Sequence, residues 1–113
     1  MKTFKLSQNE IKTLTDIKGG CFASDRITVD GQKVGYADHE KPDPNFPNDS
    51  GWRFLAGDES EEYLNNPDNF DVFEINTICN YDQNIVDILD GKVGEAYIRN
   101  GNVFELDKED IKK

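Results

Sequence analysis

The chain is poor in cysteine and has no long apolar run, and each shortage excludes a class of protein. Its two cysteines, Cys21 and Cys79, are too few and too far apart for a disulfide framework or a CxxC metal site. No apolar run approaches the ~18 residues of a membrane span, and the first ten residues contain no apolar signal segment. We therefore expect a cytoplasmic protein with two reduced thiols and no membrane association.

Phosphate-binding motifs and basic patches are also missing. The sequence contains neither GxGxxG nor GxxxxGK[ST], so nucleotide binding through a glycine-rich loop is not expected. Its 13 Lys and Arg residues are scattered and face 23 Asp and Glu residues, for a net charge of −10. Such a balance repels nucleic acids and anionic membranes, and it favours basic protein partners.

The negative charge is concentrated in one segment, residues 43–74. This segment holds nine acids and one base, Arg53, whereas the rest of the chain holds 14 acids and 12 bases. Two interpretations stay open: a surface directed at a partner, or a solvated face that keeps the protein soluble. The only tryptophan, Trp52, lies inside the same segment, either as a core residue of a strand or as an exposed aromatic anchor.

The first segment with a clear local signal is residues 7–18, which we predict to be a helix. Ser7 and Glu10 form an S-x-x-E capping box at its start. Three isoleucine and leucine side chains follow at helical spacing, and Gly19 is suited to end the helix in the left-handed conformation.

Strand signals dominate much of the remainder. Two dipeptides that accept positive φ, Asp30-Gly31 and Asn100-Gly101, each lie between β-rich arms and predict two-residue hairpins. The second hairpin sets Tyr97 opposite Phe104.

Between these hairpins we expect short strands and short helices. The stretch "WRFLA" predicts a strand with Trp52 and Phe54 on one face, and Asp58 is placed to cap a helix through Asn65. The stretch "DVFEI" predicts a second central strand, and Asp82 caps a further helix. The chain, residues 1–113, is thus expected to be one α+β domain, an antiparallel sheet built of hairpins with helices packed on one side.

Two chemical interpretations of the sequence compete with simpler ones. Cys21 and His39 could approach each other as a nucleophile and base, but a buried cysteine and a surface histidine explain the same residues. Four clustered carboxylates, Asp58, Glu59, Glu61 and Glu62, offer oxygen ligands for a hard cation, but their order matches no EF-hand loop. We therefore expect no catalytic residues, no cofactor and no dedicated metal site.

Three blocks of the sequence resemble a known bacterial family in the same order. They are "SDRITVDGQKVGY", "NDSGWRFLAGDESEEYL" and "NTICNYDQNIVDIL". They resemble immunity-protein family thirty-three, formerly a domain of unknown function, which is grouped among the immunity proteins of polymorphic toxin systems. The resemblance runs over about residues 21–99 and is most specific at "DSGWRF…GDE". The segment Ala37–His39 departs from the family pattern, and the resemblance implies no catalytic residues.

The resemblance implies a non-enzymatic immunity protein that binds and neutralises a cognate, basic toxin domain through an acidic surface. The candidate partner-binding residues are Asp49, Trp52, Asp58, Glu59, Glu61 and Glu62. Two alternatives remain: a ligand- or metal-binding accessory domain, and a small hydrolase that uses His39 with carboxylates. The oligomeric state is not predicted.

Overall fold

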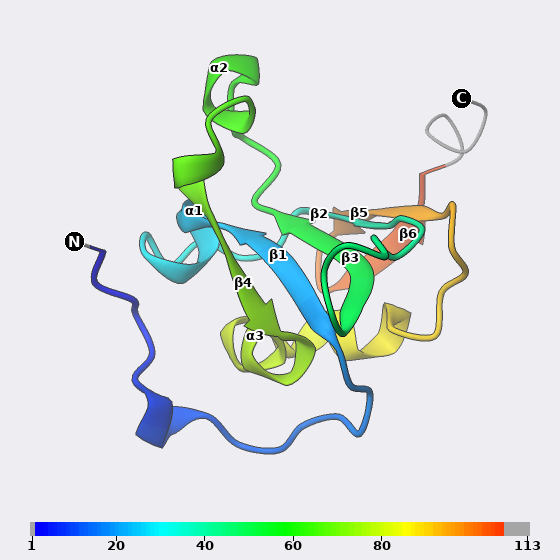
Figure 1. Ribbon diagram of the computed structural model, residues 1–113, viewed down its shortest axis with the longest axis horizontal. Helices are drawn as coiled ribbons and strands as arrows, with labels where there is room; N and C mark the ends of the chain where they lie inside the picture. Colours follow the sequence, from blue (N-terminus) through cyan, green and yellow to red (C-terminus); the bar gives the residue numbers. More distant parts are fainter. Residues whose placement is uncertain (1, 108–113) are drawn as a thin grey trace.

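A six-stranded mixed sheet organises the fold (Figure 1). The computed structural model describes residues 2–107. The strands are β1 (Gly20–Ser24), β2 (Tyr36–His39), β3 (Asp49–Leu55), β4 (Phe70–Glu74), β5 (Ala96–Asn100) and β6 (Val103–Leu106). Their order is β4-β1-β3-β2-β5-β6, and every neighbouring pair is antiparallel except β1 and β3, which are parallel. The predicted α+β class is confirmed, but the sheet is mixed rather than antiparallel, because β1 and β3 run parallel. The stretch "DVFEI" forms the edge strand β4 rather than a central strand.

The helical segments are short, and they differ in how they meet the sheet. The α-helices are α1 (Asp25–Thr28), α2 (Glu61–Leu64) and α3 (Ile75–Tyr81), and the 3-10 helices are η1 (Gln8–Glu10), η2 (Pro67–Asn69) and η3 (Gln83–Ile88). The buried side chains of α1, α3 and η3 join one core with the sheet, so these helices pack on one side of it. In contrast, α2 projects away from the sheet (Figure 1).

Trp52 and Phe54 lie at the centre of the hydrophobic core. They alternate along β3 with the exposed Arg53 and are 1% and 0% exposed. The Trp52 ring stacks on His39, with 4.4 Å between centroids, and on Phe54, with 5.8 Å. The predicted strand is confirmed, and Trp52 is a core residue. The rest of the core comprises Cys21, Ala23, Ile27, Val34, Ala37, Ile75, Ile78, Cys79, Ile85, Ile88 and Leu89.

Asp82 caps η3, as predicted for the helix that follows it, and ties this helix to the sheet. Its buried carboxylate accepts the N–H of Asn84 at 3.1 Å and the N–H of Val34 at 3.0 Å. The same carboxylate forms an ion pair with Arg99 of β5. The Arg99 guanidinium also donates to the Val34 carbonyl oxygen at 2.6 Å and lies 4.8 Å from the centroid of the Phe104 ring. Because each charge has several partners, the pair holds the last hairpin against η3.

The predicted helix over residues 7–18 is wrong beyond its first turn. The capping box forms, with the Ser7 N–H donating to the Glu10 carboxylate at 2.9 Å, but only the 3-10 turn η1 follows it. The chain then runs extended along α3, where Asn76 accepts the Leu14 N–H at 2.7 Å and Asn80 accepts the Lys12 N–H at 3.0 Å. These asparagine side chains satisfy backbone groups that a helix would have satisfied internally. The β-branched residues Ile11, Thr13, Thr15 and Ile17 also favour an extended chain.

The hairpin predicted at Asp30-Gly31 is also wrong. Ser24 caps α1 instead, its hydroxyl oxygen accepting the Arg26 N–H at 3.1 Å. Gly31 then ends the helical turn with a φ of +81° and donates its N–H to the Ile27 carbonyl oxygen at 3.1 Å. An Asp-Gly pair suits the end of a helix as well as a hairpin, because both require positive φ at glycine.

The hairpin predicted at Asn100-Gly101 is confirmed and joins β5 to β6. Its loop starts one residue later than predicted, because Asn100 is still paired in the ladder. Tyr97 therefore faces Leu106 rather than Phe104. When the hairpin loop shifts by one residue along the chain, the cross-strand partner of each residue shifts by two positions along the opposite strand.

Candidate interaction surface

The most specific block of the sequence, "DSGWRF", builds the entry into β3. The Asp49 carboxylate accepts the N–H of Asp43 at 2.8 Å and the N–H of Gly51 at 3.1 Å, which closes the preceding loop. The Ser50 hydroxyl donates to the Gly20 carbonyl oxygen at 2.6 Å and thereby joins β3 to β1. Asp49 is thus largely engaged within the chain.

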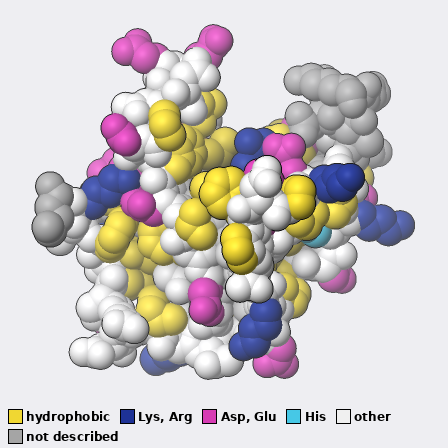
Figure 2. Space-filling view, in the orientation of Figure 1, with side chains coloured by type: hydrophobic (Ala, Val, Ile, Leu, Met, Phe, Trp, Pro, Cys, Tyr) yellow, Lys and Arg dark blue, Asp and Glu magenta, His cyan; other side chains and the backbone are white. Residues whose placement is uncertain are grey.

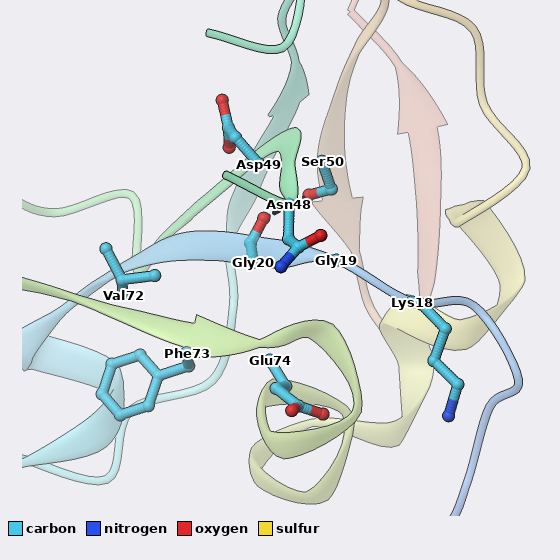
Figure 3. Close-up of a pocket in the computed structure, with 9 residues that line it drawn as sticks. All are labelled: Lys18, Gly19, Gly20, Asn48, Asp49, Ser50, Val72, Phe73 and Glu74. Atoms are coloured by element: carbon cyan, nitrogen blue, oxygen red, sulfur yellow. Dashed lines mark hydrogen bonds between the residues drawn. The ribbon is translucent and has the colours of Figure 1, made fainter. Parts of the chain in front are cut away.

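Glycine is required at position 51 for two reasons. Its φ is +86°, and a Cβ added there would lie 1.9 Å from the carbonyl oxygen of Glu40. The pairing of β1 with β3 is irregular at the same place, between Gly20 and Phe22. Figure 3 shows this entry, with Asp49 and Ser50 beside Gly20 and with Val72 and Phe73 on opposite sides of β4. The residues of the "DSGWRF" block therefore have structural roles at the entry into β3.

The carboxylates that follow β3 differ in how they are engaged. Asp58 makes a two-point ion pair with Arg26, with distances of 3.2 Å from Nε and 2.6 Å from a terminal nitrogen, and this guanidinium lowers the pKa of Asp58. Glu59 accepts the N–H groups of Ala56 and Gly57 at 2.8 and 2.9 Å. Both side chains thus stabilise the turn out of β3.

Ser60, rather than the predicted Asp58, caps α2. Its hydroxyl oxygen accepts the Tyr63 N–H at 3.0 Å, and the helix ends at Leu64. The predicted cap fails because Asp58 is held by Arg26, while serine at the following turn has the same capping ability.

Glu61 and Glu62 are the candidate acids that are exposed and make no ion pair within residues 2–107. They form the first turn of α2, where carboxylates favour the helix N-terminus, and both are exposed. Neither makes an ion pair with any residue between 2 and 107. The α2 arm, which we define as residues 57–69, carries five carboxylates and no lysine or arginine. It is therefore a projecting segment of one charge sign, and acidic side chains stand at its tip (Figure 2).

A groove lies on the open face of the sheet, opposite the helix-covered core. We define this open-face groove by its apolar residues, Phe22, Leu55, Leu64, Pro67, Phe70 and Val72. Its volume is about 880 Å³, and the α2 arm contributes one wall. Figure 2 shows hydrophobic side chains gathered on the face below α2. The groove forms because the open face of the sheet also carries apolar side chains, from β1 (Phe22), β3 (Leu55) and β4 (Phe70 and Val72).

A compact group of charges lies beside these apolar residues. Arg53 forms ion pairs with Asp38 and with Glu40, each with a shortest distance of 2.6 Å. Its hydrogen bond to Asp38 is the main cause that raises the pKa of Arg53. Two carboxylates share one guanidinium, so the group keeps one net negative charge.

His39 and Cys21 do not form the arrangement that a catalytic pair requires. The two ring nitrogens of His39 contact the carbonyl oxygens of Gly91 at 2.8 Å and Ser50 at 2.9 Å, so neither is directed at a thiol. Cys21 is 1% exposed, and burial raises the pKa of its thiol well above the ordinary value. The geometry gives His39 a structural role in holding the loop before β5 against β3.

Neither a metal-binding cluster nor a membrane-spanning helix is found among the described residues. Within residues 2–107, no three or more His, Cys, Asp or Glu side chains are grouped so that they could hold a metal ion. Over the same residues, no helix has both the length and the apolar character needed to cross a membrane.

Comparison with known proteins identifies the family. The model of the Immunity protein Imm33 domain matches residues 21–106. The chain belongs to the Imm33 immunity protein family. The match begins where the sequence resemblance begins and continues past residue 99 to the end of β6. Neither a curated protein nor a solved structure matches the chain.

Within this Imm33 domain, the candidate residues divide by location. Glu61 and Glu62 are exposed on the α2 arm, Asp58 is exposed but paired, and Glu59 and Asp49 bind backbone N–H groups. The sixth candidate, Trp52, lies in the core. Sequence reasoning missed the open-face groove. Its signal was three apolar residues on the non-core side of β1 and β4, namely Phe22, Phe70 and Val72, but their proximity becomes visible only when the pairing of the strands is known.

Proposed function

We propose that this Imm33 domain binds a cognate toxin domain and neutralises it through the acidic surface of the α2 arm. The observation that carries the proposal is the arm itself, which has five carboxylates without a base on a segment that projects from the sheet. A surface of one sign speeds the encounter with a partner of opposite sign, so the proposed toxin is basic.

The candidate residues have different roles in this proposal. Glu61 and Glu62 face solvent and are free to meet cationic side chains of the toxin. Asp58 is neutralised by Arg26, and this pair holds the start of the arm against α1. Glu59 positions the arm by holding the turn out of β3, whereas Asp49 holds the loop that precedes β3. Trp52, also named as a candidate, acts only through the stability of β3.

The alternative functions receive less support from the geometry. A ligand-binding site at the "DSGWRF" block would be favoured by an exposed Trp52 and by a pocket that Asp49 and Asp58 line together. Trp52 is buried, and the hollow of about 650 Å³ beside Asp49 does not include Asp58 among its lining residues. A hydrolase would need the ring nitrogens of His39, which contact backbone carbonyl oxygens.

A cytoplasmic location is part of the proposal. Both cysteines are buried free thiols, a state typical of a reducing compartment.

Co-expression tests the proposal directly. The probe is the toxin domain encoded beside this chain, expressed from an inducible promoter in cells that lack any other immunity protein. We expect the chain to restore growth and to co-purify with the toxin, whereas an unrelated acidic protein of the same size does neither. Arrested growth with the chain present at a level equal to the toxin would refute the proposed function.

A further inference from the structure

We infer that the open-face groove receives a short toxin segment with one or two apolar side chains flanked by lysine or arginine. The inference rests on the proposed function, and it adds the place of contact and the chemistry of the segment that fits there. It moves the centre of the interface from the tip of the α2 arm to the sheet face beside it.

Exposed apolar side chains in the groove are the first observation. Val72 of β4 is 61% exposed and Leu64 of α2 is 40% exposed, and both line the groove with the half-buried Phe22 and Phe70. Near them Phe46, from the loop before β3, is 51% exposed, with its ring edge-to-face against Phe22 at 6.1 Å. Apolar side chains from β1, β4 and α2 thus converge on one hollow, with Phe46 next to it, which is typical of the centre of a protein interface.

The charges around the groove give the second observation. Leu64, Asn65 and Pro67 of the α2 arm line one wall, and the arm carries its five carboxylates and no base next to this wall rather than in the groove itself. Beside the apolar residues, Asp38 and Glu40 share the single guanidinium of Arg53. A smaller adjoining hollow shares Phe22 and Arg53 with the groove, and its other charged lining residues are the acids Glu40, Asp43 and Asp49 and the base Lys41. The charged residues that line the two hollows are thus mostly acidic. A segment with cations beside its apolar residues therefore meets an excess of negative charge, while its apolar residues cover the floor.

The size and charge of the groove favour a basic toxin segment over a second copy of the chain. Its volume of about 880 Å³ lies in the range of pockets that hold a small ligand, so it accommodates a segment of roughly two or three residues. A second copy of the chain is a poor occupant, because each copy carries a net charge of −10 and the two acidic arms would repel each other. A basic toxin segment satisfies both the apolar and the charged part of the site.

The test compares two pairs of exposed apolar residues. The groove variant is Leu64→Ala/Val72→Ala, and the matched control is Val93→Ala/Val103→Ala, whose side chains are 53% and 59% exposed outside the groove. The Kd for the toxin domain encoded beside this chain is measured by titration calorimetry for wild type and both variants. We expect the Kd to rise at least about tenfold for the groove variant and to change less than about twofold for the control.

The outcomes separate this inference from the proposed function. If wild type binds and the groove variant binds equally well, the groove is not the docking site, while the proposed function stands. If wild type does not bind, both fail. If sedimentation instead shows a wild-type dimer that the groove variant abolishes, a second copy occupies the groove and the inference is wrong.

A measurement on wild type alone covers the case in which the groove variant unfolds. On addition of toxin, backbone amide shifts should change along β1, β4 and α2. Changes confined to α3, η3 and β6 would overturn the inference.

Discussion

Replacing Trp52 by alanine should destabilise the fold and leave the binding surface intact. The side chain is 1% exposed and contacts the rings of His39, Phe54 and Tyr97. A buried tryptophan removes ~150–250 Å² from water, which corresponds to ~4–6 kcal/mol at ~25 cal/mol per Å². Measured truncations of this kind fall at ~3–5 kcal/mol. The area estimate is somewhat higher because the denatured chain already buries part of this surface. Domains of this class are stable by only ~5–15 kcal/mol, so a large share of the total is lost.

Urea unfolding followed by circular dichroism measures this loss without relying on tryptophan fluorescence. Trp52→Phe is the matched control, because it keeps an aromatic ring in the stack and should lose about half as much. The folded fraction of Trp52→Ala should bind the toxin with an unchanged Kd. A loss of stability below ~1 kcal/mol together with weaker binding would show that Trp52 contacts the partner and would refute the core assignment.

Three further predictions concern buried groups. In urea unfolding, Asp82→Ala should lower the free energy of unfolding by ~3–5 kcal/mol, because it leaves the Arg99 charge without its partner. The double variant Asp82→Ala/Arg99→Met should recover part of this loss. Equal stability of Asp82→Ala and wild type would contradict the prediction. Burial raises the pKa of Cys79 to about 11 from an ordinary value of 9.0. The unfolded chain therefore loses this thiol proton at lower pH than the folded protein does, so the free energy of unfolding is unaffected by the thiol below about pH 9 and falls as the pH rises toward 11. Cys79→Ala should show a smaller fall between these pH values, and a fall as steep as that of wild type would exclude the thiol as the cause. Thiol counting on the unfolded, non-reduced protein should find Cys21 and Cys79 both free, and a count of zero would show a disulfide.

Local signals predicted those elements that depend on neighbouring residues alone. The strand around Trp52 and the hairpin at Asn100-Gly101 are present because alternation and a glycine with positive φ are sufficient to specify them. The helix over residues 7–18 failed because Asn76 and Asn80, more than 60 positions away, bind its backbone in an extended form. Tertiary contacts of this kind override a capping box that is itself intact.

The sequence predicted that the candidate surface is acidic, but it did not predict the groove beside it. The excess of acid in residues 43–74 is readable from the sequence, and the structure places Glu61 and Glu62 of that segment in solvent. Which acids are engaged internally was not readable, because the partner of Asp58 is Arg26, 32 positions earlier in the chain. The open-face groove likewise depends on β1 lying between β3 and β4, a strand order that no local pattern specifies.

The association rate with the toxin, measured across salt concentrations, tests the central claim most directly. The arm variant is Glu61→Gln/Glu62→Gln, which leaves Glu59 in place because its carboxylate binds two backbone N–H groups. The control Asp87→Asn/Asp90→Asn removes the same net charge from two exposed acids outside the arm.

At low salt the arm variant should associate about 3–10 times more slowly than wild type, while the control stays close to wild type and dissociation rates change little. The difference should shrink as salt screens the charges. Equal association rates for wild type and the arm variant at low salt would contradict the account, and they would leave the acidic arm as a device for solubility.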